Sequence, residues 1–353
     1  MNRLDKLRHF LLENDADAII LKGTASLRYF VGFTGDDSLL YVTKQQAILI
    51  TDSRYTLQAK AEAPDCELLE QKGGLWSALK SLGLADMKIA FESLNFTVAD
   101  YNNLLEVGSR CSFSGVDLTS LRIIKDTDEI VKINEAVEIA DAAFAALLPQ
   151  LTIGMTEIEA AAILEFEMRK RGSEAVSFPT IVASGERSAL PHGLASNKVI
   201  NKGEFVTFDF GAIVAGYHSD MTRTIIMGKA SERQKYLYNV VLEAQLLGIK
   251  EAKAGITGKE LDQVVRKFIT DAGFGDYFGH GLGHGVGLDI HELPIASKRG
   301  DNLLCENMVL TVEPGIYLGK EGGVRIEDMI VITTEGCRVL TASNKQLLEI
   351  CQS

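Results

Sequence analysis

Hydrophobic and polar positions change their spacing along the chain. In the first part, short apolar runs typical of buried strands occur at residues 17–21 (DAIIL), 46–50 (QAILI) and 87–92 (MKIAFE). The run GFTGDDS at 32–38 is rich in turn residues and predicts a loop. Strands that alternate with helical segments are typical of an α/β domain, so we expect that class here.

The spacing of apolar residues becomes typical of helices from about Asp126 onward. Apolar residues recur there at spacings of three and four, which predicts a long helix in DEIVKINEAVEIADAAFAALLPQL. The spacing of apolar residues changes near residues 120–126, and a chain of 353 residues is long enough for two domains. We therefore divide the chain into 1–123 and 124–353. The remaining predicted helices span about 156–171, 231–252 and 258–272, before glycine-rich loops and extended segments.

Two short segments of the sequence are similar to one another. VTFDFG at 206–211 matches LTVEPG at 310–315 in the order apolar, Thr, apolar, acid, any residue, Gly. Each is followed by a second acid in an extended context, Asp220 and Glu327 respectively. A match this short can arise by coincidence. The alternative is two half-domains that each contribute one hairpin with two acids, in an α+β domain with an internal pseudo-twofold repeat.

The acids of each hairpin are expected on one face. A two-residue turn at Val214–Ala215 or at Ala215–Gly216 places Asp209 and Asp220 opposite or diagonal to one another. Like charges so close destabilise a sheet, so they require protons, cations or metal. The four acids could instead point to solvent as ordinary polar residues, but the flanks FVTFDF and MVLTVE are too apolar for an exposed strand.

Histidines gather in the segment FGHGLGHGVGLDIHELP. Its glycines argue against a helix and allow backbone and ligand to approach closely. A lone histidine is usually structural, but a cluster on such a segment favours a site. Four carboxylates and an imidazole would balance two divalent cations, suit Mn, Co, Fe or Zn, and lower the pKa of a shared water. The candidates are His280, His284, His291 and His192, whereas His9 and His218 are read as incidental.

The composition excludes some partners. The formal net charge is −12, which argues against nucleic acid or an anionic membrane as the main partner. No apolar run approaches the roughly 18 residues that span a bilayer, and the charged N-terminus is a poor signal peptide. The cysteines number five, an odd count without metal-site spacing, so we expect reduced thiols and a cytoplasmic protein.

These motifs resemble one family. Asp209 and Asp220 separated by ten residues, GHGLGHGVG around His284, TVEPGIY around Glu313 and VRIED around Glu327 are similar to the metallopeptidases of the pita-bread fold, family M24. That family includes prolidase, aminopeptidase P, methionine aminopeptidase and creatinase. The resemblance is dense in the C-terminal domain. It is looser in the N-terminal domain, where TASLRYFVGFTG at 24–35 resembles the creatinase-type α/β domain.

The resemblance implies a role for each position. Asp209 binds one metal, Asp220 and Glu327 bridge both, and His284 and Glu313 bind the second. Glu313 also handles the proton of the nucleophilic water. By the same resemblance, His192 and His291 hold the scissile carbonyl and stabilise the developing oxyanion. His280 lines the substrate side, and Arg325 orients a ligand carboxylate.

The implied activity is hydrolysis of the peptide bond before proline, by a hydroxide that bridges two metals, in dipeptides or short peptides. Manganese is expected first, with Co, Zn or Fe as alternatives, and a homodimer is expected. Dipeptidase and aminopeptidase P stay open. Methionine aminopeptidase needs no N-terminal domain of this size, and creatinase departs from the ligand set. A non-catalytic pita-bread binding protein and an enzyme for another small amide are the further alternatives.

Overall fold

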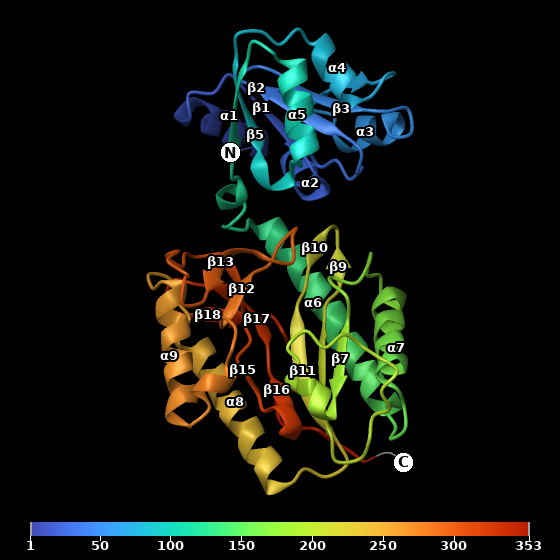
Figure 1. Cartoon of the computed structure of the whole chain (residues 1–353), viewed down its shortest axis with the longest axis vertical. Helices are drawn as coiled ribbons and strands as arrows, with labels where there is room; N and C mark the ends of the chain where they lie inside the picture. Colours follow the sequence, from blue (N-terminus) through green and yellow to red (C-terminus); the bar gives the residue numbers. More distant parts are fainter. Residues whose placement is uncertain (1, 352–353) are drawn as a thin grey trace. The chain divides into compact units, whose positions relative to one another are not determined.

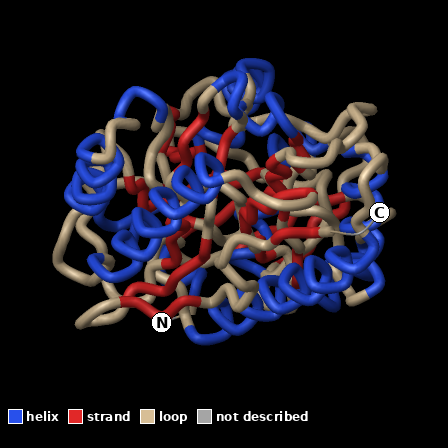
Figure 2. The backbone as a smooth tube through the Cα atoms, turned by 90° about the horizontal axis from the view of Figure 1, so that it is seen from below, coloured by secondary structure: helices blue, strands red, loops and turns tan. Residues whose placement is uncertain are grey.

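The computed structural model describes residues 2–351, which form two compact units (Figure 1). Unit 1 is Met1–Leu121 and unit 2 is Arg122–Ser353. Figure 2 shows strands in red with helices in blue around them. Among the described residues, no helix combines the length and the apolar character that crossing a bilayer requires.

Unit 1 contains a mixed six-stranded sheet in the order β4-β3-β2-β1-β5-β6. The central strand β1 pairs antiparallel with β2 and parallel with β5. Alternate apolar residues of the sheet pack against Leu79 of α4 and Leu104 of α5. The strands are β1 Ala18–Lys22, β2 Leu39–Thr43, β3 Ala47–Thr51, β4 Glu67–Glu70, β5 Lys88–Glu92 and β6 Ser112–Val116, and the helices are α1 Arg3–Glu13, α2 Thr24–Val31, α3 Thr56–Glu62, α4 Leu75–Ser81 and α5 Val98–Val107.

Unit 2 has two halves, each with a pair of helices on a curved set of strands (Figure 1). In the first half, α6 (Thr127–Leu147) and α7 (Glu157–Lys170) cover β7 (Ile181–Ser184) and β8 (Phe205–Phe210). In the second half, α8 and α9 cover the later strands. The other elements are β9 Ile213–Val214, β10 Tyr217–His218, β11 Met221–Met227, α8 Glu232–Glu251, α9 Gly258–Asp271, β12 Gly283–Gly285, β13 Glu292–Ala296, β14 Val309–Val312, β15 Gly315–Tyr317, β16 Gly323–Arg325, β17 Asp328–Ile332, β18 Cys337–Val339 and β19 Glu349–Ile350.

The hairpin with the first two acids turns at Ala215–Gly216. Val214 pairs with Tyr217 across this turn, and both turn residues have positive φ, 47° and 75°. Below the turn, Thr222 of β11 pairs with Asp209 of β8. Asp220, two residues before Thr222, is therefore diagonal to Asp209 on the same face, one of the two arrangements expected from the sequence.

The second half repeats this plan. Val312 of β14 pairs with Asp328 of β17, and Gly315 pairs with Arg325 beyond them, so Glu313 and Glu327 lie at opposed positions between these two pairs. The helix caps repeat as well. Thr156, the N-cap of α7, forms a bridge with Val199, and Thr257, the N-cap of α9, forms one with Leu303. The internal pseudo-twofold repeat predicted from the two similar segments is confirmed.

The first hairpin is closed so tightly that it depends on Gly211. A Cβ added there would lie 1.8 Å from the carbonyl oxygen of Ser219. Gly211→Ala should therefore lower the free energy of unfolding by about 1–3 kcal/mol, measured by urea denaturation. Gly336→Ala is the matched control, because nothing lies within 4 Å of its added Cβ. Equal stability of the two variants would contradict the tight closure.

Candidate metal centre

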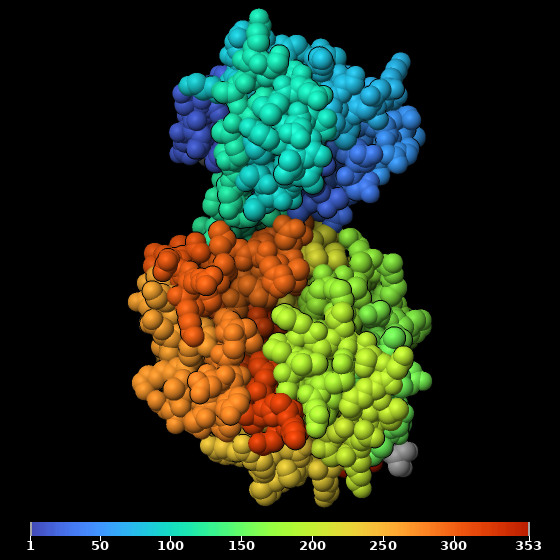
Figure 3. Space-filling model, viewed as in Figure 1, coloured from blue at the N-terminus to red at the C-terminus, as the bar shows by residue number. Residues whose placement is uncertain are grey.

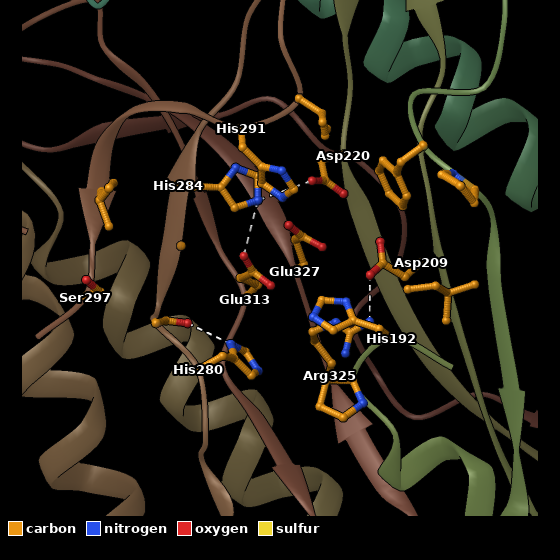
Figure 4. Close-up of a pocket in the computed structure, with 18 of the residues that line it drawn as sticks. His192, Asp209, Asp220, His280, His284, His291, Ser297, Glu313, Arg325 and Glu327 are labelled. Atoms are coloured by element: carbon orange, nitrogen blue, oxygen red, sulfur yellow. Dashed lines mark hydrogen bonds and ion pairs between the residues drawn. The ribbon is translucent and has the colours of Figure 1, made fainter. Parts of the chain in front are cut away.

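A cavity of about 420 Å³ opens between the two halves of unit 2, where Figure 3 shows a hollow. Phe178, Ile181 and Leu194 provide apolar parts of its wall. Figure 4 shows carboxylates and imidazoles directed into it from several elements. The residues that the sequence singled out all line this cavity: His192, Asp209, Asp220, His280, His284, His291, Glu313, Arg325 and Glu327.

Strand ends position the four acids. Asp209 is the fifth residue of β8, and Asp220 directly precedes β11. Glu313 directly follows β14, and Glu327 directly precedes β17. These strands are buried along their whole length, so each acid is held by a rigid core element at the point where its strand meets the cavity.

His284 faces the acids from β12. Its Nε2 lies 3.5 Å from Oδ2 of Asp220 and 3.4 Å from Oε1 of Glu313. Its Nδ1 lies 3.1 Å from the carbonyl oxygen of Gly285, which favours a proton on Nδ1 and leaves the lone pair of Nε2 facing the carboxylates. Ligand atoms of Asp220, His284 and Glu327 lie within 4.8 Å of one another.

The donor set fits divalent cations. Oδ1 of Asp209, Oδ1 of Asp220 and Oε1 of Glu327 are buried, and none has a hydrogen-bond partner among residues 2–351. Buried carboxylate oxygens without partners are costly unless a cation satisfies them. Oxygen ligands with one imidazole suit Mn, Fe, Co or Zn, whereas a thiolate site would need cysteine.

Arg325 organises the opposite side of the acid cluster. Its Nη2 donates to Oδ2 of Asp209 at 2.6 Å, and its Nε donates to Oγ1 of Thr222 at 3.0 Å. Thr222 in turn donates to Oε2 of Glu327 at 2.6 Å. Nη1 of Arg325 donates to the Tyr317 hydroxyl at 2.7 Å. One guanidinium thereby orients two of the four carboxylates.

A hydrogen-bond chain continues to the substrate side. The Tyr317 hydroxyl lies 2.8 Å from Nε2 of His280, whose Nδ1 lies 2.7 Å from the carbonyl oxygen of Gly281. A proton on Nδ1 and the Tyr317 hydroxyl donating to Nε2 satisfy both contacts. Elsewhere in the cavity, the rings of His284 and His291 meet edge to face, with centroids 4.5 Å apart (Figure 4).

Burial controls protonation in the site. Burial, reinforced by neighbouring carboxylates, raises the pKa of Asp220 and of Glu327 well above their ordinary values. Burial also raises the pKa of Glu313, to about 8. Burial lowers the pKa of His280 and His284 to about 4, so both imidazoles are neutral at pH 7. The metal-free site therefore retains protons that cations would displace.

Some site residues were not identified from the sequence. The motif TVEPGIY contains Tyr317 but gives no sign of its role in the site. Thr311, two residues before Glu313, donates to that carboxylate at 3.3 Å and accepts from the backbone N–H of His284 at 3.0 Å. The available signal was the strand period of two, because Thr311 and Glu313 share a face. The apolar residues of the cavity wall were marked by no such pattern in the sequence.

The metal-free protein should lose stability as the pH rises from about 6.5 to about 8. In this window the unfolded chain has already released the carboxyl protons that folded Glu313, Asp220 and Glu327 still hold, so higher pH favours unfolding. The buried histidines act in the opposite direction only below about pH 6.5, where the unfolded imidazoles gain protons. Calorimetry of chelator-treated protein measures this slope.

Glu313→Gln is the control for this slope, because it removes one of the three carboxyls that titrate and should make the decline less steep. The stabilisation gained on adding Mn²⁺ should grow over the same window, since ligand carboxyls must release protons to bind a cation. A melting temperature of the metal-free protein that stays constant or rises from pH 6.5 to 8 would contradict the assignment.

Comparisons with known proteins give consistent matches. Residues 131–334 match the model of metallopeptidase family M24, and residues 3–124 match the creatinase/prolidase N-terminal domain. The chain is 40% identical to an Xaa-Pro dipeptidase of Pyrococcus furiosus, over 98% of this chain and 99% of that protein.

Two solved structures show the same fold over nearly their full lengths. An Xaa-Pro dipeptidase from Bacillus anthracis has a TM-score of 0.94 and 45% identity, covering 98% of each chain. An X-Pro aminopeptidase from Thermotoga maritima has a TM-score of 0.91 and 43% identity, covering 99% of this chain and 100% of that chain. The similarity therefore includes the N-terminal unit as well as the unit with the cavity.

Proposed function

The chain belongs to metallopeptidase family M24 and is therefore a hydrolase, and from this premise we propose that it cleaves the peptide bond before proline with the help of two divalent cations. The observation that carries the proposal is the convergence of four buried carboxylates and one neutral imidazole on a single cavity, with three carboxylate oxygens lacking partners among the described residues.

The ligand set divides between two cation positions. Asp209 would hold the first cation, Asp220 and Glu327 would contact both, and His284 with Glu313 would hold the second. The contacts of Nε2 of His284 with Asp220 and Glu313, at 3.5 and 3.4 Å, support this grouping. When bound, such cations lower the pKa of a shared water and polarise the substrate carbonyl.

Proton transfer falls to Glu313. This carboxyl, 3.4 Å from Nε2 of His284, would accept a proton from the nucleophilic water and pass it to the leaving amine. Thr311 holds this carboxyl by a hydrogen bond of 3.3 Å. Arg325 fixes Asp209 by a charge-assisted bond of 2.6 Å and so orients a ligand.

Three further histidines would contact the substrate. His192 and His291 would hold the scissile carbonyl and stabilise the negative charge that develops on its oxygen. His280, fixed by its bonds to Tyr317 and Gly281, would line the substrate side.

Proline suits this arrangement. A proline peptide bond is a tertiary amide without an N–H, so a site that grips backbone as an added strand loses a hydrogen bond there. A site that relies on polarisation of the carbonyl and on apolar walls such as Phe178 and Ile181 avoids that loss.

Removal of metal should abolish hydrolysis of Ala-Pro and Ala-Pro-Ala, and Mn²⁺ should restore it, with Co²⁺, Zn²⁺ or Fe²⁺ as alternatives. The measurement is proline or Pro-Ala release by chelator-treated protein before and after each metal is added. Asp220→Asn should bind less metal and lack activity, because a bridging carboxylate loses its charge. Asp276→Asn, an exposed position outside the cavity lining, is the control.

Cleavage at an unchanged rate without metal would overturn the proposal. Full metal binding without cleavage of either peptide would favour the alternatives, a non-catalytic binding protein or an enzyme for another small amide.

The lining of the cavity favours peptides that extend beyond proline. Among the described residues that line it, Arg325 is the one lysine or arginine, and Asp209 and Tyr317 already occupy its guanidinium. Ile295 pairs with His284 across β12 and β13, and its side chain lines the cavity. The free carboxylate of a dipeptide would therefore meet no lysine or arginine side chain of the lining that is free to pair with it.

Ala-Pro-Ala should consequently be cleaved with a higher kcat/KM than Ala-Pro, and Ile295→Arg should shift this ratio toward Ala-Pro by about tenfold, the size of one charge-assisted contact. Ile295→Met, which keeps an apolar side chain, should leave the ratio unchanged. A wild-type preference for Ala-Pro would contradict this reading.

A homodimer and a cytoplasmic location stay predictions from the sequence. The five cysteines are all free, which agrees with a reducing compartment.

A further inference from the structure

His192 and His291 reach the cavity from loops, and their own side chains do little to hold them there. Both residues are exposed to the cavity, and neither imidazole hydrogen-bonds another side chain within residues 2–351. Their positions therefore depend on how the two loops are fastened. Each loop is fastened by a buried carboxylate that lies outside the cavity lining, Glu157 for one and Glu292 for the other.

Glu157, the first residue of α7, closes the loop of His192. Its side chain is 0% exposed. Oε1 accepts from the backbone N–H of Ser184 at 2.7 Å, and Oε2 accepts from Oγ of Ser196 at 2.6 Å. Nε of Arg187 adds an ion pair at 3.0 Å, and its Nη2 donates to the carbonyl oxygen of Leu194 at 2.6 Å. One carboxylate thus joins both ends of the loop and its interior.

Glu292 fastens the loop of His291 from behind. Successive residues of an extended chain point to opposite sides, so His291 enters the cavity and Glu292 turns away from it. Oε2 of Glu292 accepts from Nζ of Lys125 at 2.8 Å, and both side chains are at least 96% buried. Arg122 lies 3.5 Å from Oε1 of Glu292 and donates to Asp289 at 2.6 Å.

The loop backbone is built onto this carboxylate. Oε1 of Glu292 accepts from the backbone N–H of Asp289 at 3.1 Å. A Cβ at Gly287 would lie 2.5 Å from Oε2, so only glycine lets the chain pass so close. Lys125 is itself fixed, because its backbone N–H donates to the carbonyl oxygen of Asn307 at 3.0 Å. The anchor therefore connects the segment that opens unit 2 to the loop of His291.

We propose that Glu157 and Glu292, through their ion pairs, position His192 and His291 respectively in the reaction. Ion pairs made by a buried carboxylate are a poor way to gain stability, because desolvation offsets much of the attraction. They do fix geometry, and these two fasten the loops of the two histidines assigned to the scissile carbonyl. The inference rests on the proposed function, since it assigns both imidazoles a task that requires a fixed position.

The test is a set of double mutants of the metal-loaded enzyme. Glu157→Gln and Lys125→Met should each lower kcat/KM for Ala-Pro-Ala about tenfold, mainly through kcat, with metal content unchanged. In a His291→Ala background, Lys125→Met should cause no further loss, whereas in a His192→Ala background it should cause its full loss. Glu157→Gln should show the reverse pattern.

Two controls separate positioning from simple stability. Lys125→Arg keeps the ion pair and should restore the rate. Lys22→Met removes an ion pair of similar length, 2.9 Å to Asp100, in unit 1 and should leave hydrolysis unchanged. Losses that multiply equally in both histidine backgrounds, or a fall in metal content, would overturn the inference. If Glu157→Gln does not fold, Ser196→Ala removes one bond of the same anchor.

A second readout needs no substrate. The chain has six histidines, so their imidazole NMR signals in the Zn-loaded protein can be assigned with His192→Ala and His291→Ala. Lys125→Met should shift or broaden the signal of His291 and leave that of His192 unchanged, and Glu157→Gln should do the opposite. If these changes occur but no peptide is cleaved, the proposed function fails and the anchoring stands. If peptides are cleaved but the signals stay fixed, the anchoring fails alone.

Discussion

Mutual repulsion among four buried carboxylates is the constraint on which unit 2 depends. Apolar strands carry Asp209, Asp220, Glu313 and Glu327 to one cavity, where burial raises the pKa of three of them. Such a cluster persists only with protons, with the single guanidinium of Arg325, or with cations. Its surroundings are arranged accordingly, with a neutral imidazole on one side and a hydrogen-bonded arginine on the other.

The pseudo-twofold repeat explains how such a cluster is assembled. Each half supplies a hairpin whose two strands bring acids to the same face, and each pair of helices buries the outer side of its own strands. The two halves differ in the residues that they supply. The first half carries aspartates and the loop of His192, whereas the second carries glutamates, the glycine-rich strand β12 and the loop of His291. The ligands proposed for the two cation positions are therefore unequal in length and type.

Much of this was predictable from local patterns. The helices α7 to α9 end within about one residue of their predicted ranges, because long segments of 3.6-residue period leave little ambiguity, whereas α6 ends at Leu147 and the predicted segment continued to Leu151. Strands β1, β3 and β5 were also found, but β2 (Leu39–Thr43) and β4 (Glu67–Glu70) were not distinguished from their surroundings. Ion pairs such as Lys125–Glu292, between residues 167 positions apart, depend on packing and left no local signal.

The wide spacing of the acids along the sequence has a consequence for how the chain matures. The candidate ligands extend from residue 209 to residue 327 and come from two hairpins, one in each half, so the full set forms only when both halves are in place. An unfolded or half-folded chain presents no such set, so cations that need these five residues together would select the completed fold over its precursors. Metal binding would then be a late step of folding. It would make two halves with separate apolar cores fold and unfold as one cooperative unit.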